Sequence, residues 1–132
     1  MLIVTGLYAT VLSFLIIFLA ARVVRLRFKH HVGILDGGQP DLSKAIRVHG
    51  NAIETIPLAL ILMACAEASH LPLAVLHGVG IVLVSARIYH AYGLSHSSGR
   101  SKGRFYGTLL TWIVILFLGF CNLIAFVKTQ PL

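Results

Sequence analysis

Four long apolar stretches, separated by three shorter polar segments, make up the chain. The apolar stretches predict four helices, at approximately residues 2–26, 43–68, 72–95 and 104–127. Each stretch can cross a membrane, because about 20 apolar residues span the hydrocarbon core. The first stretch differs from a signal peptide, since its positive charges begin at Arg22 and follow the apolar run. We therefore predict an all-α fold: an integral membrane four-helix bundle that forms a single domain over residues 1–132.

The polar segments indicate how the bundle is oriented. Lys and Arg gather around residues 22–47 and 100–104, whereas residues 67–71 contain neither. Alternate connections of a bundle share one side of the membrane, and Lys and Arg favour the cytoplasmic side. We therefore predict that both basic segments are cytoplasmic and that both termini lie on the opposite side. Within the first polar segment, Asp41 or Ser43 is placed to cap the second helix.

The composition agrees with a membrane protein. Hydrophobic residues make up 58% of the chain and charged residues only 11%. Its formal net charge of +7 could indicate nucleic-acid binding, but the basic residues lie between apolar runs and are not interleaved with aromatic residues. We expect membrane lipid, and no nucleic acid, as a partner.

A polar stripe runs through the start of the second predicted helix. Arg47, Asn51 and Glu54 are spaced i, i+4 and i+7, so a helix places all three on one face. Charged side chains inside a membrane are costly and rarely lack a role. The stripe is expected to point at protein or at a water-filled cavity rather than at lipid.

The polar stripe lies at a depth in the membrane similar to that of polar residues on the third helix. At 1.5 Å per residue, Glu54 lies about 15 Å and Arg87 about 12 Å from the cytoplasmic side. We therefore predict a Glu54–Arg87 ion pair, which could serve only to hold the bundle together or could also take part in ligand binding. His49 and His90 also lie at depths similar to each other, closer to the cytoplasmic surface. The result is a net-positive cavity suited to a small anionic ligand.

These residues resemble a known family. Residues 47–57 are similar to the Arg-x-His/Gln-x-Asn-x-x-Glu-x-x-Pro signature of the membrane-associated proteins of eicosanoid and glutathione metabolism, the MAPEG superfamily. Residues 86–93 resemble its looser second signature on the third helix. The resemblance covers nearly the whole chain and is strongest to short members of the bacterial inner membrane. It implies a homotrimer with active sites between subunits, near the cytoplasmic side.

The resemblance also implies a ligand and its binding residues. Glutathione binds in the catalytic members as co-substrate, and no metal is implied. The positions that match the family's glutathione-binding residues are Arg47, Asn51, Glu54, Arg87 and His90.

The family's catalytic arginine lies at the start of the fourth helix. It activates glutathione as a thiolate, because a nearby cation lowers the pKa of a thiol. Arg104 matches this position best, with Arg100 as the alternative, since the length of the preceding loop shifts the register. Some members add an arginine from the end of the first helix, which Arg22 or Arg25 could supply.

Three functions remain open at this point. The first is a glutathione transferase or peroxidase that acts on lipophilic small-molecule electrophiles. The second is a non-catalytic membrane protein of the same fold that binds a lipid or a partner, because a fold alone does not carry an activity. The third is a small transporter or a bis-histidine haem protein, although small multidrug exporters need an acidic residue in the first helix and residues 1–21 contain none.

Overall fold

The protein consists of four long helices. The computed structural model describes residues 1–96 and 101–129. The helices are α1 (Ile3–His30), α2 (Pro40–Ala68), α3 (Leu73–His96) and α4 (Lys102–Thr129). Each is long and apolar enough to cross a membrane. The predicted all-α membrane bundle is thereby confirmed.

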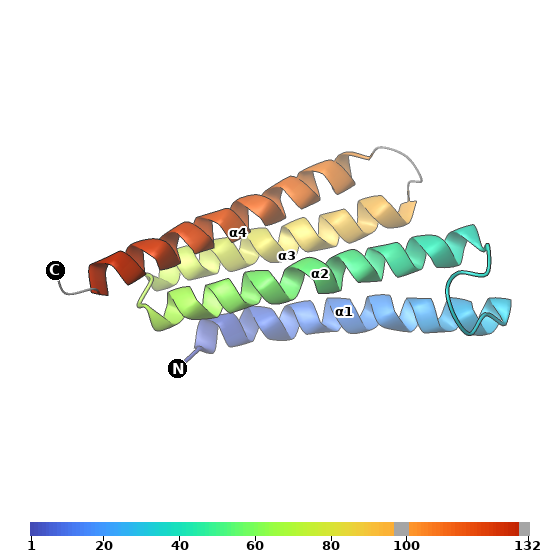
Figure 1. The fold of residues 1–132 in the computed structure, drawn as a ribbon, viewed down its shortest axis with the longest axis horizontal. Helices are drawn as coiled ribbons and strands as arrows, with labels where there is room; N and C mark the ends of the chain where they lie inside the picture. Colours follow the sequence, from blue (N-terminus) through green and yellow to red (C-terminus); the bar gives the residue numbers. More distant parts are fainter. Residues whose placement is uncertain (97–100, 130–132) are drawn as a thin grey trace.

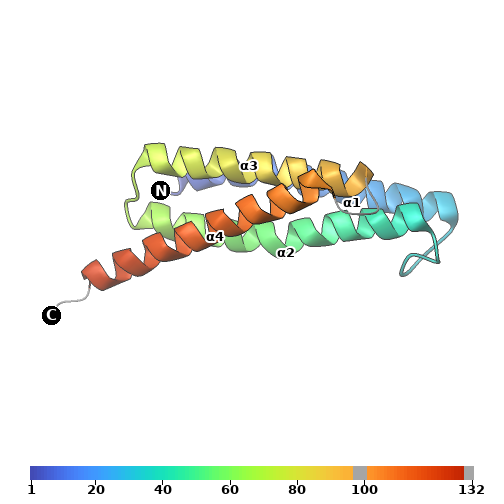
Figure 2. The same ribbon diagram turned by 90° about the horizontal axis from the view of Figure 1, so that it is seen from above.

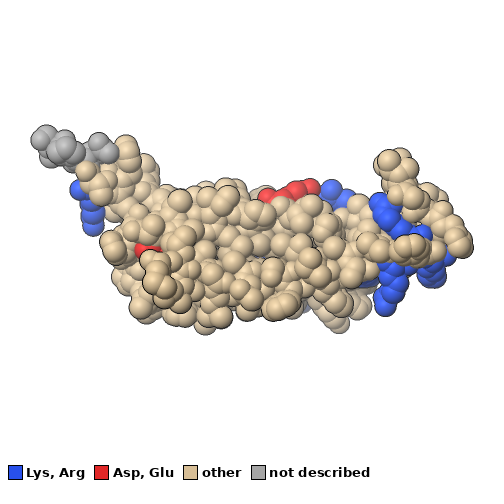
Figure 3. Space-filling view, turned by 90° about the horizontal axis from the view of Figure 1, so that it is seen from below, with Lys and Arg blue, Asp and Glu red and all other residues tan. Residues whose placement is uncertain are grey.

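The helices run side by side, each antiparallel to the one before it (Figures 1 and 2). The central pair, α2 and α3, contacts both outer helices, whereas α1 and α4 make no contact with each other within the described ranges. The start of α1 and the end of α4 lie at one end of the bundle, and residues 31–39 lie at the other (Figure 1). Lys and Arg side chains gather at this second end, which we call the basic end (Figure 3).

A buried seam orients α2. Its buried residues recur at steps of three and four, which keeps one stripe of a helix facing its neighbours. Many are alanines, and small side chains let helices approach closely in a membrane. The seam consists of Ala45, Val48, Ala52, Ile56, Ala59, Met63 and Ala66. With this stripe facing inward, the polar stripe of the same helix lies at the edge of the bundle or outside it.

The helix α1 continues to His30, four residues beyond the predicted end. It stops at His31, which adopts a left-handed conformation and donates its backbone N–H to the carbonyls of Arg27 and Phe28. These hydrogen bonds satisfy carbonyls that would otherwise lack a partner in the last turn of the helix.

The prediction of a cap from Asp41 or Ser43 is wrong. The helix α2 begins at Pro40, where the fixed backbone of proline suits a first helical position. Asp41 therefore lies inside the first turn, and its carboxylate contacts His30 Nε2 at 2.9 Å and Lys29 Nζ at 3.6 Å. Asp41 thus links the start of α2 to the end of α1.

Close packing of glycines brings α4 against α3. A Cβ on Gly103 would lie 2.9 Å from Gly93 Cα, and one on Gly107 would lie 2.6 Å from His90 Cβ. Only glycine allows backbones to approach this closely. The contact lies near the basic end and sets the position of the first turns of α4 relative to His90.

Candidate functional site

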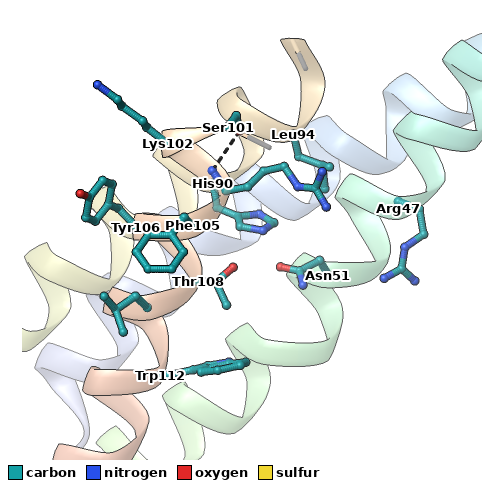
Figure 4. Close-up of a pocket in the computed structure, with 12 residues that line it drawn as sticks. Arg47, Asn51, His90, Leu94, Ser101, Lys102, Phe105, Tyr106, Thr108 and Trp112 are labelled. Atoms are coloured by element: carbon teal, nitrogen blue, oxygen red, sulfur yellow. Dashed lines mark hydrogen bonds between the residues drawn. The ribbon is translucent and has the colours of Figure 1, made fainter. Parts of the chain in front are cut away.

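A cavity of about 1000 Å³ opens near the basic end, between α2, α3 and α4 (Figure 4). Of the residues predicted to form a site, α2 contributes Arg47 and Asn51, α3 contributes His90, and α4 contributes Arg104. The remaining lining residues are Leu94, Ser101, Lys102, Phe105, Tyr106, Thr108, Leu109 and Trp112.

Arg87 lies behind the wall of this cavity and is 1% exposed. Its Nη2 donates a hydrogen bond of 2.7 Å to Asn51 Oδ1 and lies 3.4 Å from His90 Nδ1. Its Nε is buried and has no hydrogen-bond partner among the described residues. Arg87 therefore supports two residues of the cavity wall from inside the bundle.

The predicted Glu54–Arg87 ion pair is wrong for this chain. Glu54 is exposed, and within the described ranges no ion pair joins it to Arg87. Equal depth along the helix axes does not fix the direction in which a side chain points around its axis. Ala52 and Ile56 occupy the inward face of α2, so Glu54 points away from the bundle while Arg87 points into it.

The contacts of Arg87 determine which hydrogen-bonding groups remain for a ligand. A guanidinium can only donate, so Asn51 Oδ1 and His90 Nδ1 face it as acceptors. This arrangement leaves the Asn51 Nδ2 group and the His90 Nε2–H as donors. The described residues that line the cavity include three cations and no Asp or Glu. The cavity is therefore rich in donors and matches an anionic ligand with many acceptors.

The first turn of α4 adds to the positive potential. Ser101 Oγ accepts a hydrogen bond from the backbone N–H of Arg104 and donates one to the carbonyl of Gly93. It therefore caps α4 and ties its start to α3. Arg104 and Lys102 lie at the positive end of the helix dipole, where an anion is stabilised. Arg100, the alternative to Arg104, lies outside the described residues.

The aromatic side of the cavity was not predicted from the sequence. Phe105, Tyr106 and Trp112 are each at least half exposed and line the cavity. The local pattern favours core, lipid-facing or interface-belt positions for Tyr106 and Trp112. The spacing of Arg104, Thr108 and Trp112 at i, i+4 and i+8 was the available signal, because it places them along one face of α4.

A second cavity of about 570 Å³ lies further toward the basic end. It shares Arg47, Leu94 and Arg104 with the first cavity and is also lined by Lys44 and Asp41. The two cavities therefore adjoin at these shared side chains.

The arginines of α1 lie elsewhere. Arg22 Nη1 donates to Ser95 Oγ at 2.6 Å, linking α1 to the end of α3, and Arg25 is exposed. Neither lines the cavity described above. His49 is half-buried on α2 and is likewise not part of its lining.

Comparison with known proteins identifies the family. The MAPEG family model matches residues 5–124. The chain belongs to the MAPEG family. It is 39% identical over 120 residues to the "Inner membrane protein YecN" of Escherichia coli K12, covering 91% of this chain and 90% of that protein. YecN of Escherichia coli O6:H1 matches equally well. The resemblance drawn from residues 47–57 is thereby confirmed, and the family connects this chain in general terms with glutathione.

Proposed function

We propose that this MAPEG protein binds glutathione in the cavity between α2, α3 and α4. We further propose that it acts as a glutathione transferase or peroxidase on lipophilic electrophiles. One observation carries the proposal: the cavity presents donors and cations, without Asp or Glu among its described lining residues, in front of the buried Arg87.

Glutathione suits this set of groups. Its two carboxylates and two peptide carbonyls are acceptors, and Arg47, Asn51 and His90 supply donors on two walls of the cavity. Hydrogen bonds between an ionised donor and a carboxylate are among the stronger ones in proteins. Arg87 holds the Asn51 amide in a fixed orientation, so less ordering is needed when the ligand binds.

Arg104 is the proposed catalytic residue. A cation beside a thiol favours the thiolate, which is the reactive nucleophile. The thiolate sulfur attacks the electrophilic carbon, a sulfur–carbon bond forms, and the leaving group departs with its electron pair. The thiol proton goes to water at the basic end.

The aromatic side of the cavity suits the second substrate. Trp112 lies two turns of α4, about 12 Å along the axis, beyond Arg104. Phe105 and Leu109 line the surface between them. A lipophilic electrophile could enter here from the bilayer, while glutathione arrives from the basic end.

The exposed face of α2 supports assembly into a homotrimer. Glu54 lies midway along this 29-residue helix and is exposed, as is Arg47 on the same face. A carboxylate facing hydrocarbon at this depth is costly. A neighbouring copy would cover it. Glu54 of one subunit would then complete the cavity between α2, α3 and α4 of the next, as the matching family position and the family's sites between subunits imply.

We also propose that the protein resides in the bacterial inner membrane with its basic end in the cytoplasm. The four candidate spans and the location named for the YecN relatives support the compartment. The excess of Lys and Arg at the basic end supports the orientation.

The test combines binding and turnover in detergent-purified protein. Calorimetry measures glutathione binding, ultraviolet difference absorbance measures the bound thiolate, and an aryl halide measures conjugation. We expect Arg104→Ala to abolish the thiolate signal and conjugation. Lys102→Ala is the matched control, since it removes another cation of the same turn, and we expect it to weaken binding while the thiolate still forms.

Each outcome distinguishes the possibilities. Absence of glutathione binding to the wild-type protein would refute the proposal. Glutathione binding without turnover would favour the non-catalytic alternative, in which the aromatic side of the cavity holds a lipid. If Arg100→Ala, and not Arg104→Ala, abolished the thiolate signal, the catalytic role would belong to Arg100.

A further inference from the structure

A separate cavity of about 380 Å³ lies at the end of α1, where the chain turns into residues 31–39. It shares no lining residue with the proposed glutathione cavity, which is built from α2, α3 and α4. Its walls combine basic and apolar groups. They are formed by Val24, Arg27, Phe28, His31, Val32 and Gly33.

Arg27 lines this cavity and carries a hydrogen-bond donor without a partner among the described residues. Its Nη1 is buried and has no hydrogen-bond partner within the described residues, and no ion pair of Arg27 occurs there. Buried polar atoms almost always have a partner. A charged donor without one indicates that an acceptor from outside the chain completes the site.

The position of Arg27 along α1 indicates which acceptor is available. Residues 1–21 carry no charge, and Arg22 marks the end of this apolar run. Arg27 lies about 7.5 Å further along the helix axis at 1.5 Å per residue. The headgroup region extends about 5–8 Å beyond the hydrocarbon on each side of a bilayer. Arg27 is therefore at the level of lipid phosphates.

Exposed apolar side chains lie in the cavity wall and in the loop that follows it. Phe28 is 77% exposed, and the adjoining loop presents Ile34 at 79% and Leu35 at 76%. Large apolar residues beside several cations are typical of surfaces that enter the membrane interface. A soluble anion would use the cations alone, whereas a phospholipid would also cover the apolar groups.

We propose that this cavity binds an anionic phospholipid of the leaflet at the basic end. The lipid phosphate accepts a hydrogen bond from the Arg27 guanidinium, which turns its buried Nη1 toward the phosphate, with the His31 imidazole beside it. An acyl chain lies along Val24 and Phe28. The bound lipid holds the end of α1 and the following loop at the membrane surface.

The test compares two arginines of α1. Purified protein in neutral detergent is titrated with phosphatidylglycerol or phosphatidylcholine, and native mass spectrometry counts the bound lipid. Arg27→Gln removes the cavity cation, whereas Arg25→Gln removes an exposed cation that does not line the cavity. We expect phosphatidylglycerol affinity to fall roughly fifty-fold for Arg27→Gln but only about fivefold for Arg25→Gln, because only the first also loses a charge-assisted hydrogen bond.

Further measurements separate the lipid from other occupants. Circular dichroism verifies that both variants keep the wild-type helix content, and Arg27→Lys, which keeps the charge, is expected to restore part of the affinity. Equal losses for the two Gln variants would overturn the proposal, as would equal binding of both lipids by the wild type. Displacement of the lipid by glycerol phosphate at matching concentration would show a soluble phosphate site instead. A change of oligomeric mass in Arg27→Gln would mean that a second copy covers the cavity.

Discussion

Gly107 provides the sharpest test of how the site is assembled. A methyl group at this position would lie 2.6 Å from His90 Cβ, 2.9 Å from His90 Cα and 2.8 Å from the carbonyl oxygen of Ala86. Backbone atoms and a Cβ cannot rotate away as the end of a flexible side chain can. The substitution Gly107→Ala must therefore push α4 away from α3.

The expected loss of stability on the Gly107→Ala substitution is the balance of two opposing effects. Inserting a methyl group into a packed interior costs about 1–3 kcal/mol. Replacing a helical glycine by alanine gains about 0.5–1 kcal/mol. We expect Gly107→Ala to lower the free energy of unfolding by about 1–2 kcal/mol, and to weaken glutathione binding because His90 moves with the displaced contact.

The assay is unfolding by a denaturing detergent, followed by the fluorescence of Trp112, the single tryptophan of the chain. The matched control is Gly119→Ala on the same helix, since a Cβ there would have no atom within 4 Å of it. We expect this control to be as stable as the wild type or slightly more stable. If Gly107→Ala were no less stable than Gly119→Ala, the close packing of α3 and α4 described here would be refuted.

Three further predictions follow from individual contacts. In double-mutant cycles, the changes in unfolding free energy for Arg87→Leu and Asn51→Leu should be non-additive by about 1–3 kcal/mol. Those for Arg87→Leu and Glu54→Gln should add within about 0.5 kcal/mol. The reverse pattern would contradict the contacts of Arg87. Glu67→Ala should lower the unfolding free energy by about 2 kcal/mol, because this carboxylate accepts two backbone N–H groups at the start of α1, and unchanged hydrogen exchange of that turn would count against this role. Tyr8→Phe should cost about 1 kcal/mol in the same unfolding assay, since it removes a hydroxyl bonded to α3; an unaltered midpoint would argue that this bond contributes nothing.

Polar contacts between helices were only partly predictable. Nothing along the chain predicts that the Glu67 carboxylate accepts hydrogen bonds from the backbone N–H groups of Val4 and Thr5. Glu67 follows a long apolar run, and its local pattern predicts only a connection between helices, with no sign of a partner more than sixty residues away. Such a contact depends on which helix ends meet, and that is a property of the assembled bundle.

The sequence by itself determined the class of the protein and most of its helices. Apolar runs of this length are expected in a membrane. There they leave few structures other than a helix, because every backbone polar group in a bilayer must be satisfied internally. The motif of residues 47–57, with the looser one of residues 86–93, was sufficient to indicate the family, which the match over residues 5–124 confirmed. These features are local, so they can be read along the chain.

Only the tertiary structure decided the direction in which each side chain points. Depth along a helix can be counted from the sequence, but rotation about its axis depends on which face packs inward. In α2 the alanine-rich seam takes that face, so Asn51 meets Arg87 while Glu54 turns outward. Likewise, the glycine contact between α3 and α4 brings Arg104, Lys102 and Trp112 to one cavity. Packing between helices, rather than the pattern within any one of them, therefore set the composition of the proposed glutathione site.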